Sequence, residues 1–212
     1  KRHLAELLPT TRVTMHYGLT EASRSAFMEF HVDEANIATV GKASPYTDIQ
    51  VFDEKGNMLP QGQEGEICIK GEHVTNGYLN IPADDIFYGD GYFRTGDSGT
   101  INEDGYITLK SRIKELINVG GKKVAPTEVD EQILKIPGVA DCACVASKDP
   151  EGVLGEVVKA FIVKGSEDIT FEQISEQLMG KLEAYKMPAQ YEWIDAIPKT
   201  ANGKIQRNLL QE

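Results

Sequence analysis

Short runs of alternating apolar and polar residues, separated by turn residues, fill the first half of the chain. Such runs occur at Ile49–Phe52, Glu66–Lys70 and Tyr106–Leu109, and a further short strand is expected at Val13–Tyr17. Turn signals such as Gly56-Asn57 lie between them. Alternation with a period of two places one face of each strand in a core. The pattern up to residue 110 therefore predicts a small antiparallel sheet or barrel.

After Lys110 the pattern changes to strands rich in β-branched residues and to stretches of helical spacing. Strands are expected at Glu115–Val119, Lys122–Ala125, Val139–Ala146, Val157–Val163 and Tyr191–Ile194. One helix is expected to begin at a capping-box-like Thr127 and to reach about Ile136. A second opens at Thr170, with apolar residues at helical spacing from Phe171 to Leu182. The order β-β-α-β-β-α-β predicts a compact α+β domain.

The expected fold class is α+β, with two parts joined by a hinge. Residues 1–110 form a small antiparallel, barrel-like β-rich part, and residues 111–212 form a compact α+β domain. The boundary is placed at residues 111–114. A length of 212 residues is enough for two small globular units.

Composition and charge exclude several classes of protein. The net charge of −11 argues against a nucleic-acid surface. Apolar runs such as Ala160–Val163 are far shorter than the roughly 20 residues of a membrane helix. The first residues lack a signal-peptide core and an initiator Met, so we expect a cut from a longer chain. Cys68, Cys142 and Cys144 lack metal spacing and are expected to be buried, reduced thiols of a cytoplasmic protein.

Four segments carry residue types that suit a nucleotide or a phosphate. In Tyr17-Gly18-Leu19-Thr20-Glu21, an aromatic ring, a hydroxyl and a carboxylate suit a purine, a phosphate oxygen and Mg²⁺. In Arg94-Thr95-Gly96-Asp97, the carboxylate of Asp97 could accept both ribose hydroxyls. Gly120-Gly121 is either a hairpin turn or a place of close ligand approach. Lys204 is either a solvated side chain or a point charge for phosphate oxygens. Each segment on its own is more often an ordinary turn or surface.

Together, five segments resemble the adenylate-forming superfamily, which includes acyl-CoA synthetases, adenylation domains of nonribosomal peptide synthetases and firefly luciferase. In chain order these segments are Tyr17–Glu21, Gly65–Gly77, Arg94–Asp97, Arg112–Glu128 and Pro198–Arg207. The resemblance covers essentially the whole chain. It implies the carboxyl-terminal half of such an enzyme, most similar to an AMP-forming acyl-CoA synthetase.

The resemblance implies roles for individual residues in adenylation. The nucleotide-binding residues are expected to be Tyr17, Gly18, Thr20, Asp97 and Arg112. Among these, Tyr17 packs on adenine, and Asp97 and Arg112 approach the ribose. The catalytic residues are expected to be Thr20 at the phosphate, Glu21 as a Mg²⁺ ligand, and Lys204. The cation of Lys204 bridges carboxylate and phosphate oxygens and stabilises charge that develops at the α-phosphate.

For the second step the resemblance implies a rotation of the small domain about a hinge at Lys114. Rotation withdraws Lys204 and presents Gly120-Gly121 to the pantetheine arm of coenzyme A. Two positions depart from the family pattern, Ser111 and Asn118, and neither removes a proposed contact. The segment Ala22–Phe30 is expected to border the acyl pocket.

The expected function is that of an ATP-dependent carboxylate–thiol ligase that forms an acyl-adenylate and then a thioester of a fatty or aromatic acid. ATP, Mg²⁺ and coenzyme A, or a carrier-protein phosphopantetheine, are implied. The family's Ser/Thr/Gly-rich phosphate loop does not occur in this sequence. The missing N-terminal part is thus an expected partner, and the 212 residues alone are expected to be inactive in adenylation. Two alternatives remain: an enzyme that loads a carrier protein, and a non-catalytic nucleotide-binding module.

Overall fold

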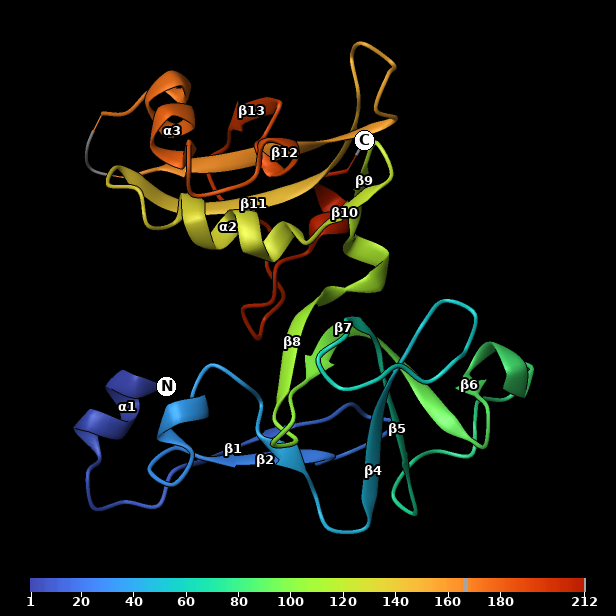
Figure 1. Ribbon diagram of the computed structural model, residues 1–212. Coiled ribbons are helices and arrows are strands. Elements are labelled where there is room, and N and C mark those ends of the chain that lie inside the picture. The colour runs from blue at the N-terminus through green and yellow to red at the C-terminus, as the bar shows by residue number, and fades with distance from the viewer. Residues whose placement is uncertain (166–167, 212) are drawn as a thin grey trace. The chain divides into compact units, whose positions relative to one another are not determined.

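The computed structural model describes residues 1–165 and 168–211 of the chain. They divide into two compact units, Lys1–Ile113 and Lys114–Glu212. Each unit has a hydrophobic core of its own and combines strands with short helices (Figure 1). The α+β fold class is therefore confirmed. None of the helices in the described ranges is long and apolar enough to span a bilayer.

The first unit is built mainly from short strands. Its strands are β1 (Thr14–Tyr17), β2 (Ala26–Glu29), β3 (Lys42–Ala43), β4 (Thr47–Phe52), β5 (Gly65–Gly71), β6 (Phe87–Tyr88), β7 (Tyr92–Ile101) and β8 (Ile107–Arg112). Its helical segments are α1 (Arg2–Leu7), η1 (Glu34–Asn36) and η2 (Ala83–Asp85), and η3 (Ile113–Glu115) begins at its last residue.

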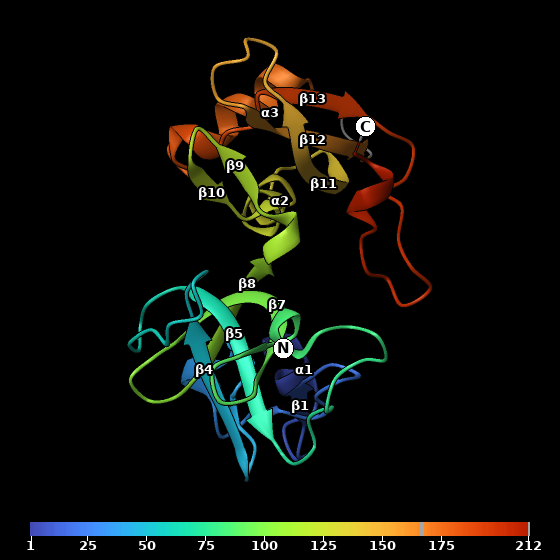
Figure 2. The ribbon, with the colours of Figure 1, turned by 90° about the vertical axis from the view of Figure 1, so that its right-hand side faces the viewer.

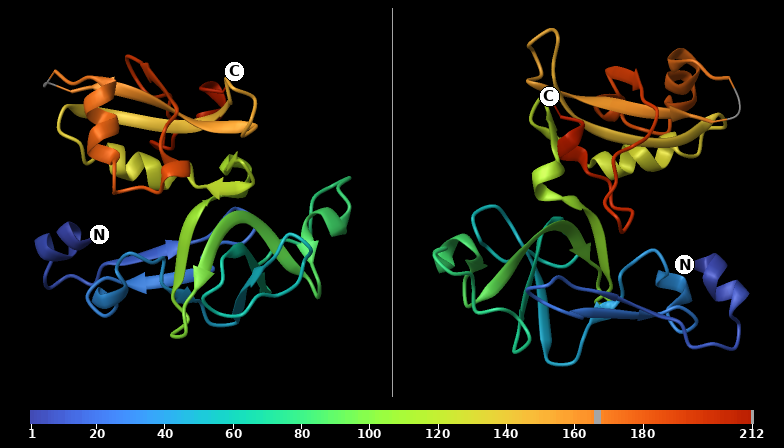
Figure 3. Two further views of the ribbon diagram at one scale, coloured as in Figure 1. Left: turned by 45° about the horizontal axis from the view of Figure 1, so that its top comes forward. Right: turned by 180° about the vertical axis from the view of Figure 1, so that it is seen from behind.

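The strands of the first unit form two antiparallel sheets. One has the order β1-β2-β3, and the other has the order β4-β5-β7-β6 with β8 paired to β7. Figure 3 shows β7 as a long, bent ribbon, and its register against β8 shifts between Ser98 and Gly99. Ala26 of the first sheet and Val51 and Ile67 of the second belong to one buried cluster. Both sheets therefore share a core.

The second unit contains a hairpin and a three-stranded sheet. Its strands are β9 (Ile117–Val119), β10 (Lys122–Val124), β11 (Val139–Lys148), β12 (Glu156–Lys164) and β13 (Gln190–Trp193). Its helical segments are α2 (Pro126–Ile133), α3 (Phe171–Leu178), η4 (Ala184–Lys186) and η5 (Arg207–Leu209). β12 pairs antiparallel with β11 and parallel with β13. The predicted order β-β-α-β-β-α-β is confirmed.

Alternate residues of β11 face two separate clusters. Cys142 and Cys144 are fully buried in the cluster that also holds residues of α2 and α3. Ala143 and Val145 pack on the opposite side, with residues of the C-terminal segment. The prediction that both cysteines are buried on one strand is confirmed, and burial raises the pKa of both thiols.

Four local predictions in the second unit are wrong. The segment at Glu115 begins as a 3-10 turn, and the strand starts only at Ile117. α2 begins at Pro126 rather than Thr127, because a proline at the first helical position needs no N–H partner. α2 also ends at Ile133, short of the predicted end near Ile136. α3 ends at Leu178, so Leu182 is buried but lies outside the helix, beyond Gly180.

Candidate nucleotide site

The carboxylate of Asp97 is the centre of a polar cluster in the first unit. Asp97 lies on β7 opposite Arg112 of β8. Only 8% of the surface of Asp97 is exposed. Arg112 Nε lies 2.9 Å from one carboxylate oxygen, and Tyr17 Oη donates to the other over 2.6 Å. Arg112 Nη1 also donates to the carbonyl of Thr95 at 2.9 Å. Three expected nucleotide-binding residues therefore meet at one carboxylate.

The backbone around Asp97 is held by a second buried carboxylate, that of Glu66 on β5. Glu66 accepts the backbone N–H of Gly96 at 3.0 Å and the Nε–H of Arg94 at 3.1 Å. The hydroxyl of Thr95 donates to the carbonyl of Ile67 at 2.6 Å and accepts the N–H of Asp97 at 3.0 Å. Gly96 has φ +72°, which favours glycine. The Asp97 side chain is thus positioned before any ligand binds.

Tyr17 remains a hydrogen-bond donor over the whole physiological pH range. Burial, and secondly the neighbouring charge of Asp97, raise the pKa of its phenol well above the usual value. A carboxylate oxygen has two lone pairs, so each oxygen of Asp97 retains acceptor capacity beside Tyr17 and Arg112. Two vicinal hydroxyl groups are donors that match this remaining capacity.

The turn after β1 carries Gly18, Thr20 and Glu21. Glu21 accepts the hydroxyl of Tyr78 at 2.6 Å, and its backbone carbonyl accepts the N–H of Thr75 at 2.7 Å. This hydrogen bond raises the pKa of Tyr78. Thr20 is exposed. A Cβ at Gly18 would lie 2.6 Å from the backbone nitrogen of Arg24, so packing within the turn requires glycine there.

The expected acyl-pocket segment Ala22–Phe30 contributes mostly to the interior of the unit. Met28 and Phe30 are 1% and 5% exposed and pack with Ile37 in a core cluster. Phe27, in contrast, is 41% exposed. The burial of Met28 and Phe30 is therefore explained by core packing.

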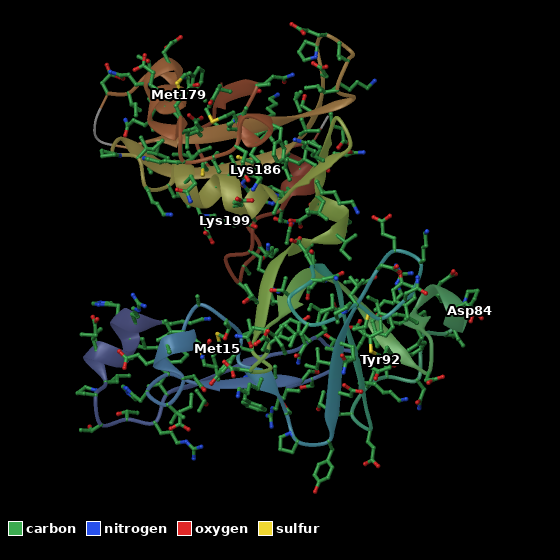
Figure 4. All side chains as sticks on the ribbon, in the orientation of Figure 1. Met15, Asp84, Tyr92, Met179, Lys186 and Lys199 are labelled. Carbon is green, nitrogen blue, oxygen red and sulfur yellow. The ribbon has the colours of Figure 1, made fainter. Side chains whose placement is uncertain are left out.

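Lys204 lies in the second unit, on a short looped hairpin before η5. Lys199 and Ile205 form an isolated antiparallel bridge, and Thr200 and Lys204 exchange backbone and hydroxyl hydrogen bonds across the turn. Lys204 is exposed. This loop extends away from the sheet of its unit (Figure 2), and its first lysine, Lys199, is labelled in Figure 4.

Gly120 and Gly121 form the turn between β9 and β10, as the turn chemistry predicted. Their φ angles are +56° and +87°. A Cβ at Gly120 would lie 2.9 Å from a side-chain carbon of Leu154, whereas a Cβ at Gly121 has no heavy atom within 4 Å among the described residues. Lys114, the expected hinge, is exposed and lies within η3 at the division between the units.

Sequence reasoning missed two residues of the first unit. Tyr78 holds Glu21, and Glu66 holds the turn of Asp97. Glu66 left a signal, since it is a charged residue beside the apolar run Ile67–Ile69 of its strand. The sequence pattern gave no sign of the contact between Tyr78 and Glu21, because the two residues lie 57 positions apart.

Comparisons with known families cover most of the chain. Residues 1–79 match the family described as AMP-binding enzyme, and residues 128–204 match the AMP-binding enzyme C-terminal domain. Oxalate–CoA ligase of Saccharomyces cerevisiae is 38% identical over 92% of this chain and 36% of its own length. 2-Succinylbenzoate–CoA ligase of Enterococcus faecalis is 36% identical over 92% of this chain and 40% of its own length.

Solved structures agree with the sequence relatives. ATP-bound MatB from Rhodopseudomonas palustris has a TM-score of 0.86 and 34% identity, covering 93% of this chain and 40% of that one. MenE from Bacillus subtilis with its acyl-adenylate intermediate has a TM-score of 0.86 and 25% identity. The match covers 99% of this chain and 43% of the MenE chain. This chain belongs to the family of AMP-binding, adenylate-forming enzymes. It spans roughly two fifths of the length of these relatives.

Proposed function

We propose that the chain is part of an ATP-dependent carboxylate–thiol ligase that forms an acyl-adenylate and then an acyl thioester with coenzyme A. The observation that carries this proposal is the Asp97 carboxylate. Tyr17 and Arg112 hold it, and each of its oxygens can still accept a further hydrogen bond. The family membership supports the same chemistry. Tyr17 contacts Asp97 directly, so a ribose bound at this carboxylate would lie beside the residue whose ring we propose to pack on adenine.

Glu21 and Thr20 fit the phosphate end of the nucleotide. Glu21 offers a carboxylate oxygen, the ligand type that Mg²⁺ prefers, and its second oxygen accepts Tyr78. Bound Mg²⁺ neutralises part of the phosphate charge. The exposed hydroxyl of Thr20 can donate to a phosphate oxygen. Lys204, on its exposed loop, supplies a cation that stabilises charge developing at the α-phosphate.

The thiol step uses Gly120-Gly121 and a rotation about Lys114. At Gly121 the open space where a Cβ would stand leaves the backbone approachable by a narrow pantetheine arm. The buried thiols of all three cysteines support a reducing, cytoplasmic location.

The acid itself is proposed only as a class, a fatty or aromatic carboxylic acid. Relatives named for long-chain fatty acids and ferulate support it, whereas those named for oxalate and 2-succinylbenzoate favour a dicarboxylic acid. The test is acid-dependent pyrophosphate exchange, and then thioester formation with coenzyme A, by a full-length protein across a panel of both kinds of acid. Exchange without transfer to coenzyme A favours a carrier-protein acceptor, and no exchange with any acid favours a non-catalytic module.

A further inference from the structure

Arg207 is a buried cation that joins three elements of the second unit. Its residue is 6% exposed. Its guanidinium donates to Asp130 of α2 at 2.6 Å and to the carbonyl of Cys144 on β11 at 2.8 Å. The third contact, from Nε to Glu115 at 3.1 Å, reaches the segment directly after Lys114. The planar fork of arginine suits three acceptors at fixed directions.

Asp130 is fully engaged in the same cluster. Its other oxygen accepts the backbone N–H of Cys144 at 2.7 Å, so helix α2, strand β11 and η5 meet at one carboxylate. Buried ion pairs add little net stability compared with apolar packing, because both charges lose hydration. Their directional contacts fix geometry instead.

The geometry fixed here is that of the loop that carries Lys204. Arg207 lies three residues after Lys204, and the loop closes through the hydrogen bond from Gln206 N–H to the carbonyl of Pro198 at 2.9 Å. At the other side of the loop, Lys199 Nζ lies 2.5 Å from Asp141 of β11. The loop base is therefore fastened to β11 at both ends.

We infer that Arg207 is a positioning residue for adenylation, which orients Lys204 and ties its loop to the segment that follows the hinge. This inference rests on the proposed role of Lys204. Glu115 is adjacent to Lys114, so the Arg207–Glu115 contact connects the Lys204 loop to the hinge segment. In the proposed rotation about Lys114, the loop and this segment would therefore move together.

The test compares both half-reactions in a full-length protein. Arg207→Lys keeps the charge beside Asp130 but loses the fork, and Glu115→Gln alters only the outermost contact. Both substitutions are expected to lower the rate of pyrophosphate exchange, by up to about 10²-fold, because a small displacement of a catalytic group is enough. KM for ATP and thioester formation from preformed acyl-adenylate are expected to stay unchanged. Ile174→Ala, in the core of α3, is the control for lost stability.

A double variant separates positioning from general damage. In a Lys204→Ala background, Arg207→Lys is expected to cause no further loss of exchange, since it acts through Lys204. An additive loss, or an equal loss in both half-reactions as in Ile174→Ala, overturns the inference. If Lys204→Ala alone leaves exchange intact, the proposed role of Lys204 fails instead, which is a distinguishable result.

Discussion

A buried carboxylate such as that of Asp97 is stable as an anion only if its oxygens are bonded. Arg112 compensates the charge, and Tyr17 adds a neutral donor that leaves the net charge of the pair unchanged. The cluster is therefore complete without ligand and still able to accept more hydrogen bonds.

Replacing Asp97 is expected to weaken nucleotide binding directly. Asp97→Ala in a full-length protein should cost about 2–4 kcal/mol of ATP binding, the value of two hydrogen bonds to a charged acceptor in a partly dry site. Isothermal calorimetry measures it. Asp104→Ala, which removes the same charge from an exposed turn of the same hairpin, is the control. Unchanged ATP binding in Asp97→Ala would show that the ribose assignment is wrong.

The raised pKa of Tyr17 predicts a pH dependence of stability. An unfolded tyrosine loses its proton near pH 10, whereas folded Tyr17 retains it to higher pH. The unfolded state is therefore favoured as pH rises above about 10, and the free energy of unfolding falls, by at most about 1.4 kcal/mol per pH unit. Tyr17→Phe should show a shallower decline in denaturation experiments between pH 9 and 11. Identical slopes for both proteins would contradict the prediction.

At the scale of single elements, the two helices of the second unit show what local sequence signals decide. Thr170 and Gln173 form the capping box that their spacing predicts. At α2 a similar pattern at Thr127 does not set the start of the helix. Pro126 fits the first helical position, so α2 begins one residue earlier than predicted. Local sequence signals therefore determine where both helices begin. Where two signals compete, as at Pro126 and Thr127, the sequence alone did not show which one decides.

The capping box of α3 gives a prediction for that element. Thr170→Ala should lower the free energy of unfolding of the second unit by about 1 kcal/mol, since the N–H of Gln173 loses its acceptor. Trp193 is the chain's single tryptophan, and its ring stacks on Phe171 of α3 at 4.3 Å, so its fluorescence reports this unit. Gln177→Ala, at an exposed position of the same helix, is the control. Equal denaturation curves for the two variants would contradict the role of the cap.

Side-chain contacts between strands that are distant in the sequence could not be predicted from the sequence. Tyr17 and Asp97 were recognised separately by residue type and family resemblance, but their direct hydrogen bond depends on how two sheets share one core. The same holds for Glu66, whose carboxylate reaches Gly96 through the pairing of β5 with β7. Periodicity predicts strands and their buried faces, whereas register, bulges and sheet packing decide which polar ends meet.

At the scale of the whole molecule, the candidate residues are divided between the two units. The first unit holds Tyr17, Glu21, Asp97 and Arg112, and the second holds Gly120, Gly121 and Lys204. In the proposed rotation, a hinge at Lys114 would let the second unit use Lys204 in one half-reaction and Gly120-Gly121 in the other. Substitutions at Lys204 and at Gly121 should then each impair a different half-reaction.

Lys204→Ala should slow pyrophosphate exchange on the order of 10²–10³-fold in a full-length protein, because it removes a cation from the adenylation transition state. Thioester formation from preformed acyl-adenylate should persist, since the proposed rotation would withdraw Lys204 before that step. Lys181→Ala, which removes another exposed lysine of the same unit, is the control.

Gly121→Leu should show the opposite pattern, with normal exchange and a blocked thiol step. Its φ of +87° strains any L-residue by about 1–2 kcal/mol, so Gly121→Ala is the matched control that carries the strain without the bulk. Lys114→Pro should also spare exchange and impair thiol transfer, because a fixed φ resists rotation at the hinge, whereas Lys114→Ala leaves the backbone free. If Lys204→Ala and Gly121→Leu impair both half-reactions equally, a single static site replaces rotation as the explanation, because only a moving unit can use its two faces in turn.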